Sequence, residues 1–225
     1  MTIQHILRTS ISALALLLFG STTALAGTLG LQFGLDTNSI EAMGTFYLAF
    51  QLVDGSGTGD ANNTVTLSGF NFDGGSVAGV PTLYGGASGS LSSGVTLTDS
   101  DPFFNAMWQD FVPGPWVTFY ATFTNNADSG PFQDMFMMSI LDGSQNGIPT
   151  VDPSGNNTFL TVTLNGTVQS PAPGVLAPPL GVWGADPQQT SYNMSAPEVV
   201  PEPGSLMLLG SALAGLGLWR RRRRH

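Results

Sequence analysis

The sequence predicts an all-β protein: an antiparallel β-sandwich of jelly-roll or immunoglobulin-like type, with one short helix. Two patterns lead to this prediction. Apolar residues recur at every second position in about seven stretches of the chain, which is the spacing of one face of a strand. Clusters of Gly, Asn, Asp and Ser separate these stretches and supply the backbone angles that reverse a chain.

The alternation places the expected strands at residues 29–35, 46–52, 64–72, 95–98, 117–124, 136–140 and 160–164. The stretch 117–124 is the clearest, because it alternates Val and Phe with Thr and Tyr, and these side chains favour a pleated surface. Turns are expected at 54–57, 73–75, 125–130 and 142–144, each rich in turn residues.

One segment departs from this alternation. Its apolar residues recur at spacings of three and four, and they are Phe103, Phe104, Met107, Trp108 and Phe111. Asp101 is a suitable helix cap, and Pro102 suits the first helical position. The segment therefore predicts a short helix that closes one end of the sandwich and turns its aromatic side chains into the core. A sugar-stacking surface is the alternative.

The first 26 residues are expected to be a secretory signal peptide. A polar start with Arg8 precedes the apolar run Ala13–Phe19, and Ala24-Leu25-Ala26 is a small-x-small cleavage site before Gly27. The apolar run is far shorter than the roughly 20 residues of a membrane span. The chain is therefore expected to leave the cytoplasm through the secretion machinery.

The body of the chain carries negative charge alone. Between residues 27 and 219 there is no Lys, Arg or His, whereas all 15 acidic residues lie there. Nucleic acid and anionic lipid are therefore poor partners, because nothing in the body can neutralise phosphate. Soluble cations remain possible partners. Cysteine is absent, so disulfides and thiolate metal sites are excluded and stability must come from a core.

The composition divides the chain into four parts. After the signal peptide, residues 27–169 are the expected sandwich domain, and residues 170–199 form a Pro-rich linker expected to hold the domain off a surface. Trp183 is a residue that could tack part of this linker to the domain. Residues 200–225 form the tail.

The tail has a motif, a short apolar segment and a basic end, in that order. The motif is Val200-Pro201-Glu202-Pro203-Gly204-Ser205; a hydrophobic helix is expected over 206–219, and the arginine block covers 220–224. A helix of this length rises only about 21 Å, less than the roughly 30 Å hydrocarbon core. The arginines would stay in the cytoplasm. The tail is therefore expected to hold the chain in the inner membrane transiently.

This tail resembles the PEP-CTERM sorting domain, a region also labelled an ice-binding protein C-terminal domain. The resemblance implies that exosortase, a membrane transpeptidase-like protease, reads the tail and cuts near Pro-Glu-Pro, after which the protein reaches the cell surface or extracellular matrix. Family members are typically exported by Gram-negative bacteria that make exopolysaccharide, so exopolysaccharide is an expected partner. The resemblance covers only the tail, and it implies where the protein is sorted and how it is processed, not what the protein does. Ice binding does not follow from it.

The body loosely resembles a group of small PEP-CTERM proteins that begin with a strand of the type Leu31-Gln32-Phe33-Gly34-Leu35-Asp36. That group has no assigned activity, so this second resemblance adds no function.

The residue types of the body argue against an enzyme. Without His, Cys, Lys or Arg, the body lacks the usual base for a serine nucleophile, thiol and Schiff-base nucleophiles and imidazole ligands. Paired carboxylates could still act as acid and base. Asp128-Ser129-Gly130 matches the aspartic protease triplet, but it lies among turn residues, and the nearest second copy, Asp36-Thr37-Asn38, does not match. No catalytic residue is therefore assigned.

Two kinds of binding site remain. Calcium suits carboxylates near turns, and the candidate ligands are Asp99, Asp101 and Asp142, with Asp54, Asp60 and Asp152 in a wider set. Ordinary turn chemistry explains the same residues, and no other cofactor is expected. Glycan stacking is assigned to Trp108, Trp116 and Tyr120, with Tyr47, Tyr84 and Trp183 as further candidates.

Three functions are compatible with these features. The first is a non-catalytic surface or matrix protein associated with exopolysaccharide. The second is a carbohydrate-binding module. The third is a hydrolase that uses carboxylates alone.

Overall fold

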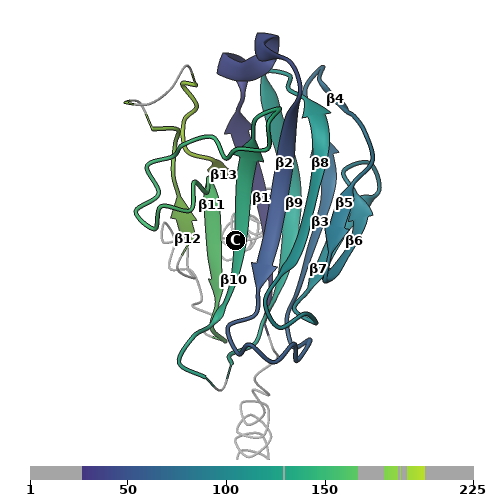
Figure 1. Ribbon diagram of the computed structural model, residues 1–225, viewed down its shortest axis with the longest axis vertical. Coiled ribbons are helices and arrows are strands. Elements are labelled where there is room, and N and C mark those ends of the chain that lie inside the picture. Colours follow the sequence, from purple (N-terminus) through teal and green to yellow (C-terminus); the bar gives the residue numbers. More distant parts are fainter. Residues whose placement is uncertain (1–26, 129, 167–179, 187, 189–191, 201–225) are drawn as a thin grey trace, which may run out of the picture.

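The computed structural model describes residues 27–128, 130–166, 180–186, 188 and 192–200, and these form a sandwich of two antiparallel sheets (Figure 1). One sheet has six strands in the order β13-β1-β9-β3-β7-β6. The other has seven, in the order β12-β11-β10-β2-β8-β4, with β5 also paired to β8. The predicted fold class, an antiparallel β-sandwich, is confirmed at this level.

The six-stranded sheet contains β13 (Glu198–Val200), β1 (Gly27–Asp36), β9 (Trp116–Asn125), β3 (Thr64–Asn71), β7 (Gly94–Thr98) and β6 (Gly86–Ser90). The seven-stranded sheet contains β12 (Leu180–Val182), β11 (Leu160–Leu164), β10 (Asp134–Leu141), β2 (Phe46–Val53), β8 (Asn105–Val112), β4 (Ser76–Val77) and β5 (Thr82–Tyr84). All seven stretches expected from the alternation are strands: β1, β2, β3, β7, β9, β10 and β11.

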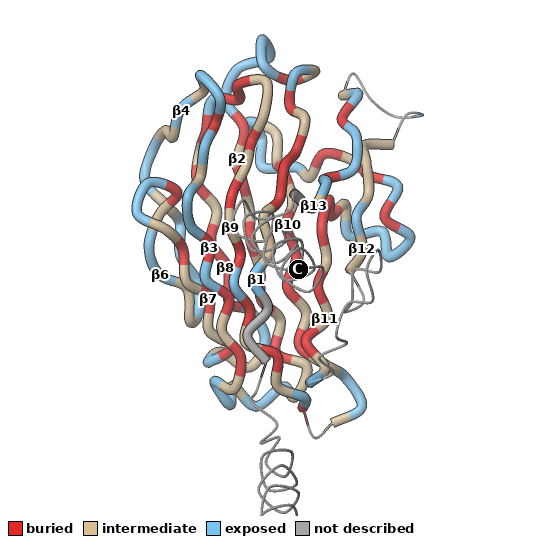
Figure 2. Tube along the Cα trace, turned by 180° about the vertical axis from the view of Figure 1, so that it is seen from behind, coloured by how far each residue is buried: buried red, intermediate tan, exposed pale blue. Residues whose placement is uncertain are grey.

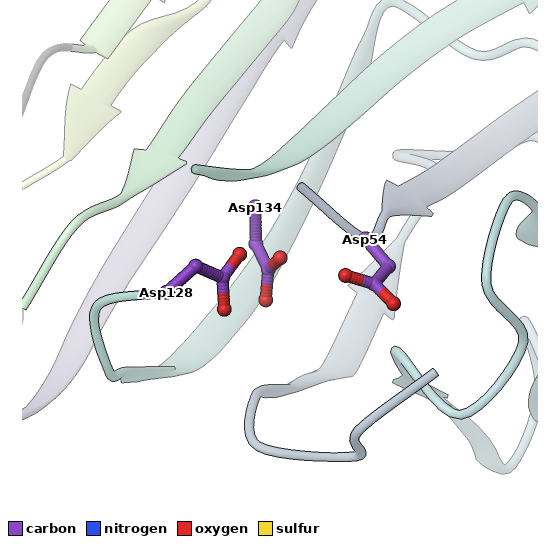
Figure 3. A group of neighbouring side chains, drawn as sticks. All are labelled: Asp54, Asp128 and Asp134. Carbon is purple, nitrogen blue, oxygen red and sulfur yellow. The ribbon is translucent and has the colours of Figure 1, made fainter. Parts of the chain in front are cut away.

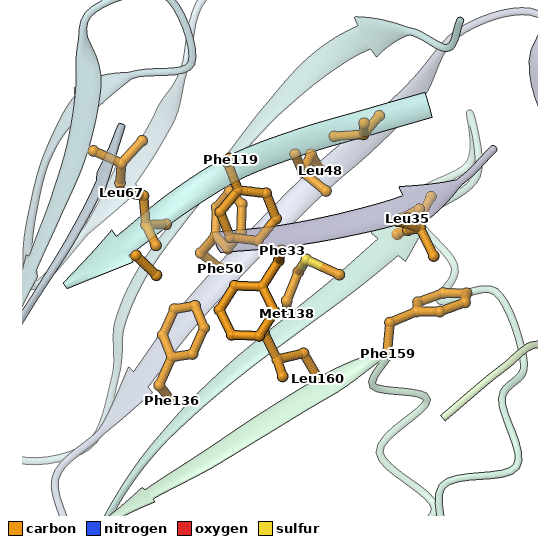
Figure 4. Close-up of a cluster of buried hydrophobic side chains, with 14 of the residues drawn as sticks. Phe33, Leu35, Leu48, Phe50, Leu67, Phe119, Phe136, Met138, Phe159 and Leu160 are labelled. Carbon is orange, nitrogen blue, oxygen red and sulfur yellow. The ribbon is translucent and has the colours of Figure 1, made fainter. Parts of the chain in front are cut away.

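The core lies between the sheets and is rich in phenylalanine (Figure 4). In β2, Phe50 is 1% exposed and its ring lies 5.6 Å from that of Phe119 in β9 of the opposite sheet. Buried and half-buried residues alternate along the central strands, as the two-residue period requires (Figure 2). Apolar burial of this kind supplies the stability that a chain without cysteine cannot obtain from disulfides.

The short helix predicted after Asp101 is wrong. Residues 105–112 form β8, which pairs with β2 on one side and with β4 and β5 on the other. A strand is more favourable than a helix here because its backbone N–H and C=O groups form hydrogen bonds with neighbouring strands on both sides. Met107 and Phe111 still reach the core in this conformation, and each is 0% exposed. Asp101 instead caps a turn, since its Oδ1 accepts hydrogen bonds from the N–H groups of Phe103 and Phe104, both at 3.0 Å. A short 3-10 helix, Asn38–Met43, lies instead between β1 and β2.

Parts of the expected Pro-rich linker belong to the sandwich. β12 pairs with β11, and β13 pairs with β1, so each sheet gains an edge strand from this range. The Trp183 N–H donates to the Phe159 carbonyl at 3.1 Å, and Met194 is 3% exposed. The described segments at 180–186 and 192–200 are therefore docked on the domain and do not form a free spacer.

The strand order differs from that of a constant immunoglobulin domain. That domain pairs its first two strands in one sheet, whereas β1 and β2 lie in opposite sheets here. The expected signal peptide, the helix at 206–219 and the arginine block lie outside the described residues. Among the residues that are described, no helix is both long and apolar enough to cross a membrane.

Candidate functional site

A cavity of about 390 Å³ opens on the outer face of the seven-stranded sheet. Its floor is made by small outward-facing side chains of three neighbouring strands: Ala49 of β2, Ala106 of β8 and Ser139 of β10. The register places Ala49 opposite Ser139 on one side and opposite Trp108 on the other. Small residues in the middle of a sheet face leave room above them, and larger neighbours form the walls.

An aromatic wall of Phe104 and Trp108 bounds one side of the cavity, and Tyr84 packs against both rings. The half-buried ring of Trp108 on β8 stacks on Tyr84 of β5, with ring centroids 4.7 Å apart and planes inclined by 29°. Phe104 meets Tyr84 edge-on at 5.8 Å and Trp108 at 6.5 Å. Tyr84 and Phe104 remain 44% and 38% exposed. The pairing of β5 with β8, which sets Tyr84 opposite Ala106, brings these rings together.

A loop held by Asp152 forms the facing side. Asp152 is 7% exposed; its Oδ1 accepts from the Ser154 N–H at 2.8 Å and the Ser154 hydroxyl at 2.7 Å, and its Oδ2 accepts from the Thr158 hydroxyl. Burial alone would raise the pKa of Asp152, but these hydrogen bonds bring the pKa below its usual value. The carboxylate therefore fixes the loop that presents Asn156 and Asn157 to the cavity.

A second feature is a cluster of three carboxylates at one end of the sandwich, the lower end in Figure 1 (Figure 3). Asp54 directly follows β2, Asp134 begins β10, and Asp128 lies on the connection from β9 to β10. Because Val53 pairs with Met135, the end of β2 and the start of β10 are adjacent. One carboxylate oxygen from each residue lies within 4.8 Å of the others.

The carboxylates of the cluster are buried and only partly satisfied by amides. Asp54, Asp128 and Asp134 are 5%, 8% and 0% exposed. Backbone N–H groups of residues 56–59 all donate to Asp54. Asp134 accepts from the Gly55 N–H and from the Asn63 side-chain amide, both at 2.8 Å. Asp128 accepts from Asn62 at 2.8 Å through Oδ1, but its buried Oδ2 accepts no hydrogen bond from any described residue.

The close packing of these buried carboxylates shifts their pKa values. Burial, together with the neighbouring carboxyl of Asp99, raises the pKa of Asp134 to about 6. Burial also raises the pKa of Asp99, and burial together with Asp134 raises that of Asp128. For Asp54 the burial effect is outweighed by its hydrogen bonds, and its pKa is lowered. No basic side chain exists in residues 27–219 to offset this charge.

Comparison with protein families gives one result, at the C-terminal end: residues 199–223 match the family model of the PEP-CTERM protein-sorting motif. The chain carries a PEP-CTERM sorting motif. This motif indicates export and sorting to the cell surface by exosortase, a membrane protein, and the resemblance noted in the sequence is confirmed. No curated protein and no solved structure matches the chain.

The PEP-CTERM match begins within the folded domain. Its first two residues, Val199 and Val200, belong to β13, where they pair with Phe33 and Gln32 of β1. The sorting motif therefore starts on the edge of the six-stranded sheet, whereas the cavity lies on the outer face of the other sheet. The remaining motif residues, 201–205, and the signal cleavage residues Ala24 and Ala26 lie outside the described residues.

The glycan-stacking residues expected from the sequence are not brought together. Trp108 lines the cavity, but Trp116 and Tyr120 lie on β9 in the opposite sheet. The Tyr120 ring packs over Gly69, where an added Cβ would lie 2.8 Å from the ring. Tyr84, in the wider candidate set, does join Trp108. Phe104 was assigned to the core of the predicted helix, and the pairing of β8 places it in the cavity wall instead.

The expected calcium residues are also separated. Asp99 is 0% exposed and lies beside the cluster, since the Asn63 N–H donates to it at 2.9 Å. Asp101 caps the nearby turn, and Asp142 follows β10 at the opposite end of the strand from Asp134. In the sequence, Asp128 has the character of a turn residue, and Asp134 is not among the expected calcium ligands. An acid at the first position of an otherwise apolar strand is the signal that could have identified Asp134.

Proposed function

We propose that this exported PEP-CTERM protein is a non-catalytic surface or matrix protein that binds an uncharged stretch of polysaccharide in the outer cavity of its seven-stranded sheet. The observation that carries the proposal is the ring of Trp108, which lines the cavity beside a floor of small side chains and is supported from behind by its stack on Tyr84. Aromatic rings that remain partly exposed next to a cavity offer an apolar face together with a polar rim, which is the combination found at binding surfaces.

The polar part of the lining suits a ligand with many hydroxyl groups. Gln51, Asn156 and Asn157 carry side-chain amides, and Ser139 and Thr158 carry hydroxyls. Amides and hydroxyls both donate and accept hydrogen bonds, as sugar hydroxyls do. Such groups fix the orientation of a ligand whose carbon faces rest on the aromatic wall.

The charge of the site favours a neutral ligand. Among the described residues, none of those that line the cavity carries an ionisable side chain. An anionic polymer would meet no cation there and would be repelled by the acidic body.

The same lining supports a non-catalytic role. Glycoside cleavage usually requires two carboxyl groups on either side of the scissile bond, and in the part of the chain that the structure describes no Asp or Glu lines the cavity. The carboxylates of Asp54, Asp128 and Asp134 lie at the end of the sandwich and are nearly inaccessible. A carboxylate-only hydrolase is therefore less well supported than a binding protein.

Trp108→Ala tests the binding proposal. The exported protein is screened on a glycan array, and the affinity for the best ligand is then measured by calorimetry. Loss of a central aromatic side chain is expected to weaken binding by about 30-fold, the effect of removing a hot-spot residue. Trp116→Ala is the matched control, because Trp116 lies on the opposite sheet and its loss should leave affinity unchanged. Equal weakening by both variants, with both still folded, or no bound glycan, would contradict the proposal.

The sorting event leads to a separate prediction. We expect the mature protein to begin at Gly27 and to end near Pro201–Pro203, because the signal is removed at Ala26 and exosortase is expected to cut near Pro-Glu-Pro. Intact-mass measurement of the protein recovered from outside the cell checks both ends. A mass that includes His225 would show instead that the tail is kept as a permanent anchor.

A further inference from the structure

We propose that Asp54, Asp128 and Asp134 bind one calcium ion at the end of the sandwich where β2 ends and β10 begins. The observation that points to a ligand is the Oδ2 atom of Asp128, which is buried and accepts no hydrogen bond from the described residues. A buried carboxylate oxygen without a partner is costly, and such groups are normally paired or coordinate a metal. The proposal is independent of sugar binding in the outer cavity.

The spacing of the three carboxylates fits one ion. Calcium binds oxygen ligands at about 2.3–2.6 Å, so two oxygens on the same ion can be up to about 5 Å apart. One oxygen from each of Asp54, Asp128 and Asp134 lies within 4.8 Å of the other two. Carboxylates are the oxygen ligands that calcium prefers, and water and backbone carbonyls complete its coordination in most proteins.

The charge balance requires a cation or a proton. Asp99 adds a fourth carboxylate next to Asp134, and the body has no basic side chain that could act as counter-ion. A bound calcium ion would neutralise part of this charge, and extracellular calcium modules bind the ion with a Kd of about 0.1–1 mM.

The site would join segments that are far apart in the chain. Asp54 holds the loop after β2 through the backbone N–H groups of residues 56–59, and Asp128 lies on the connection between the sheets. An ion that bridges them would oppose separation of these loops on heating. Binding to the folded state alone raises the unfolding temperature.

The test is thermal unfolding and calorimetry of the purified exported protein at pH 7.5, with calcium chloride as the only added ligand. We expect one calcium per chain and, at a concentration about 100-fold above Kd, a rise in Tm of about 5–10 °C relative to chelating buffer. No rise in Tm together with no heat of binding would overturn the proposal. An equal response to magnesium would overturn the assignment to calcium.

Two variants locate the site. Asp128→Asn keeps the shape of the side chain and removes its charge, so it should abolish the calcium response while the Tm in chelating buffer stays equal or rises. Asp142→Asn is the matched control, because Asp142 caps a turn at the other end of β10 and should respond like the wild type. A full response in Asp128→Asn, or a lost response in Asp142→Asn, would overturn the site. The stoichiometry measured on the wild type decides the matter if Asp128→Asn does not fold.

Discussion

Asn63→Ala is expected to lower the free energy of unfolding by about 3 kcal/mol, because it removes one hydrogen bond to a buried carboxylate and two to the backbone of Asn126. Asn63 is 0% exposed, and its amide nitrogen donates to Asp134 at 2.8 Å and to the Asn126 carbonyl at 3.0 Å. Its amide oxygen accepts from the Asn126 N–H at 2.8 Å. Alanine would therefore remove a donor from a crowded carboxylate and also detach the chain that follows β9.

Urea unfolding monitored by circular dichroism, in chelating buffer, measures this loss. Asn71→Ala is the matched control: Asn71 accepts one hydrogen bond from the Asp73 N–H at 3.1 Å in an exposed turn, so its loss should change stability by no more than about 0.5 kcal/mol. Similar small effects of both substitutions would show that the amide does not support the carboxylate cluster.

Phe50→Ala is expected to cost about 3–5 kcal/mol, as large-to-small changes of a buried phenylalanine do. The Phe50 ring lies 5.6 Å from Phe119 across the sandwich, 6.1 Å from Phe136 and 5.8 Å from Phe70. Its removal leaves a cavity where the two sheets meet, and neighbours held in strands on both sides can collapse into it only in part.

The same urea measurement applies to Phe50→Ala, and Phe103→Ala is its control. Phe103 is 75% exposed in the turn before β8, so its ring contributes little to the core. A loss in Phe50→Ala no greater than that in Phe103→Ala would mean that contact between the sheets at this point does not determine stability.

The central strands of both sheets could be predicted because every second residue is buried, without exception, in β2 and in β9. β8 was missed for a physical reason. A spacing of four residues is compatible with one face of a helix and, being even, with one face of a strand. Met107 and Phe111 are four apart and share the inner face, while Phe104 and Trp108 are four apart and both line the outer cavity. The spacing alone therefore could not distinguish helix from strand.

The short edge strands left no pattern in the sequence. β6 reads Gly-Ala-Ser-Gly-Ser and is defined by its pairing with β7, and β12 and β13 lie in a range whose prolines favour an open chain. Strands of this kind are determined by a partner distant in sequence, which a local pattern does not contain.

The candidate sites were predictable in part for a similar reason. Trp108 was identified from its residue type, but its neighbour Tyr84 arrives through the pairing of β5 with β8. In the acidic cluster, Asp134 bonds to Gly55, 79 positions away, and Asn63 bonds to Asp134 across 71 positions. Turn residues near Asp54 and Asp99 explained those acids locally, and only the folded chain places them around Asp134.

Because β13 overlaps the start of the sorting motif, only a short length of chain separates the folded domain from the expected cleavage position. Residue 200 is the last residue of β13, and an extended chain advances at most about 3.6 Å per residue. A cut after one to three further residues would therefore be made at most about 11 Å of chain away from the end of β13, for as long as β13 stays paired with β1. An enzyme that cuts there must either bind the chain with the edge of the folded sandwich close to its active site, or act after β13 has separated from β1.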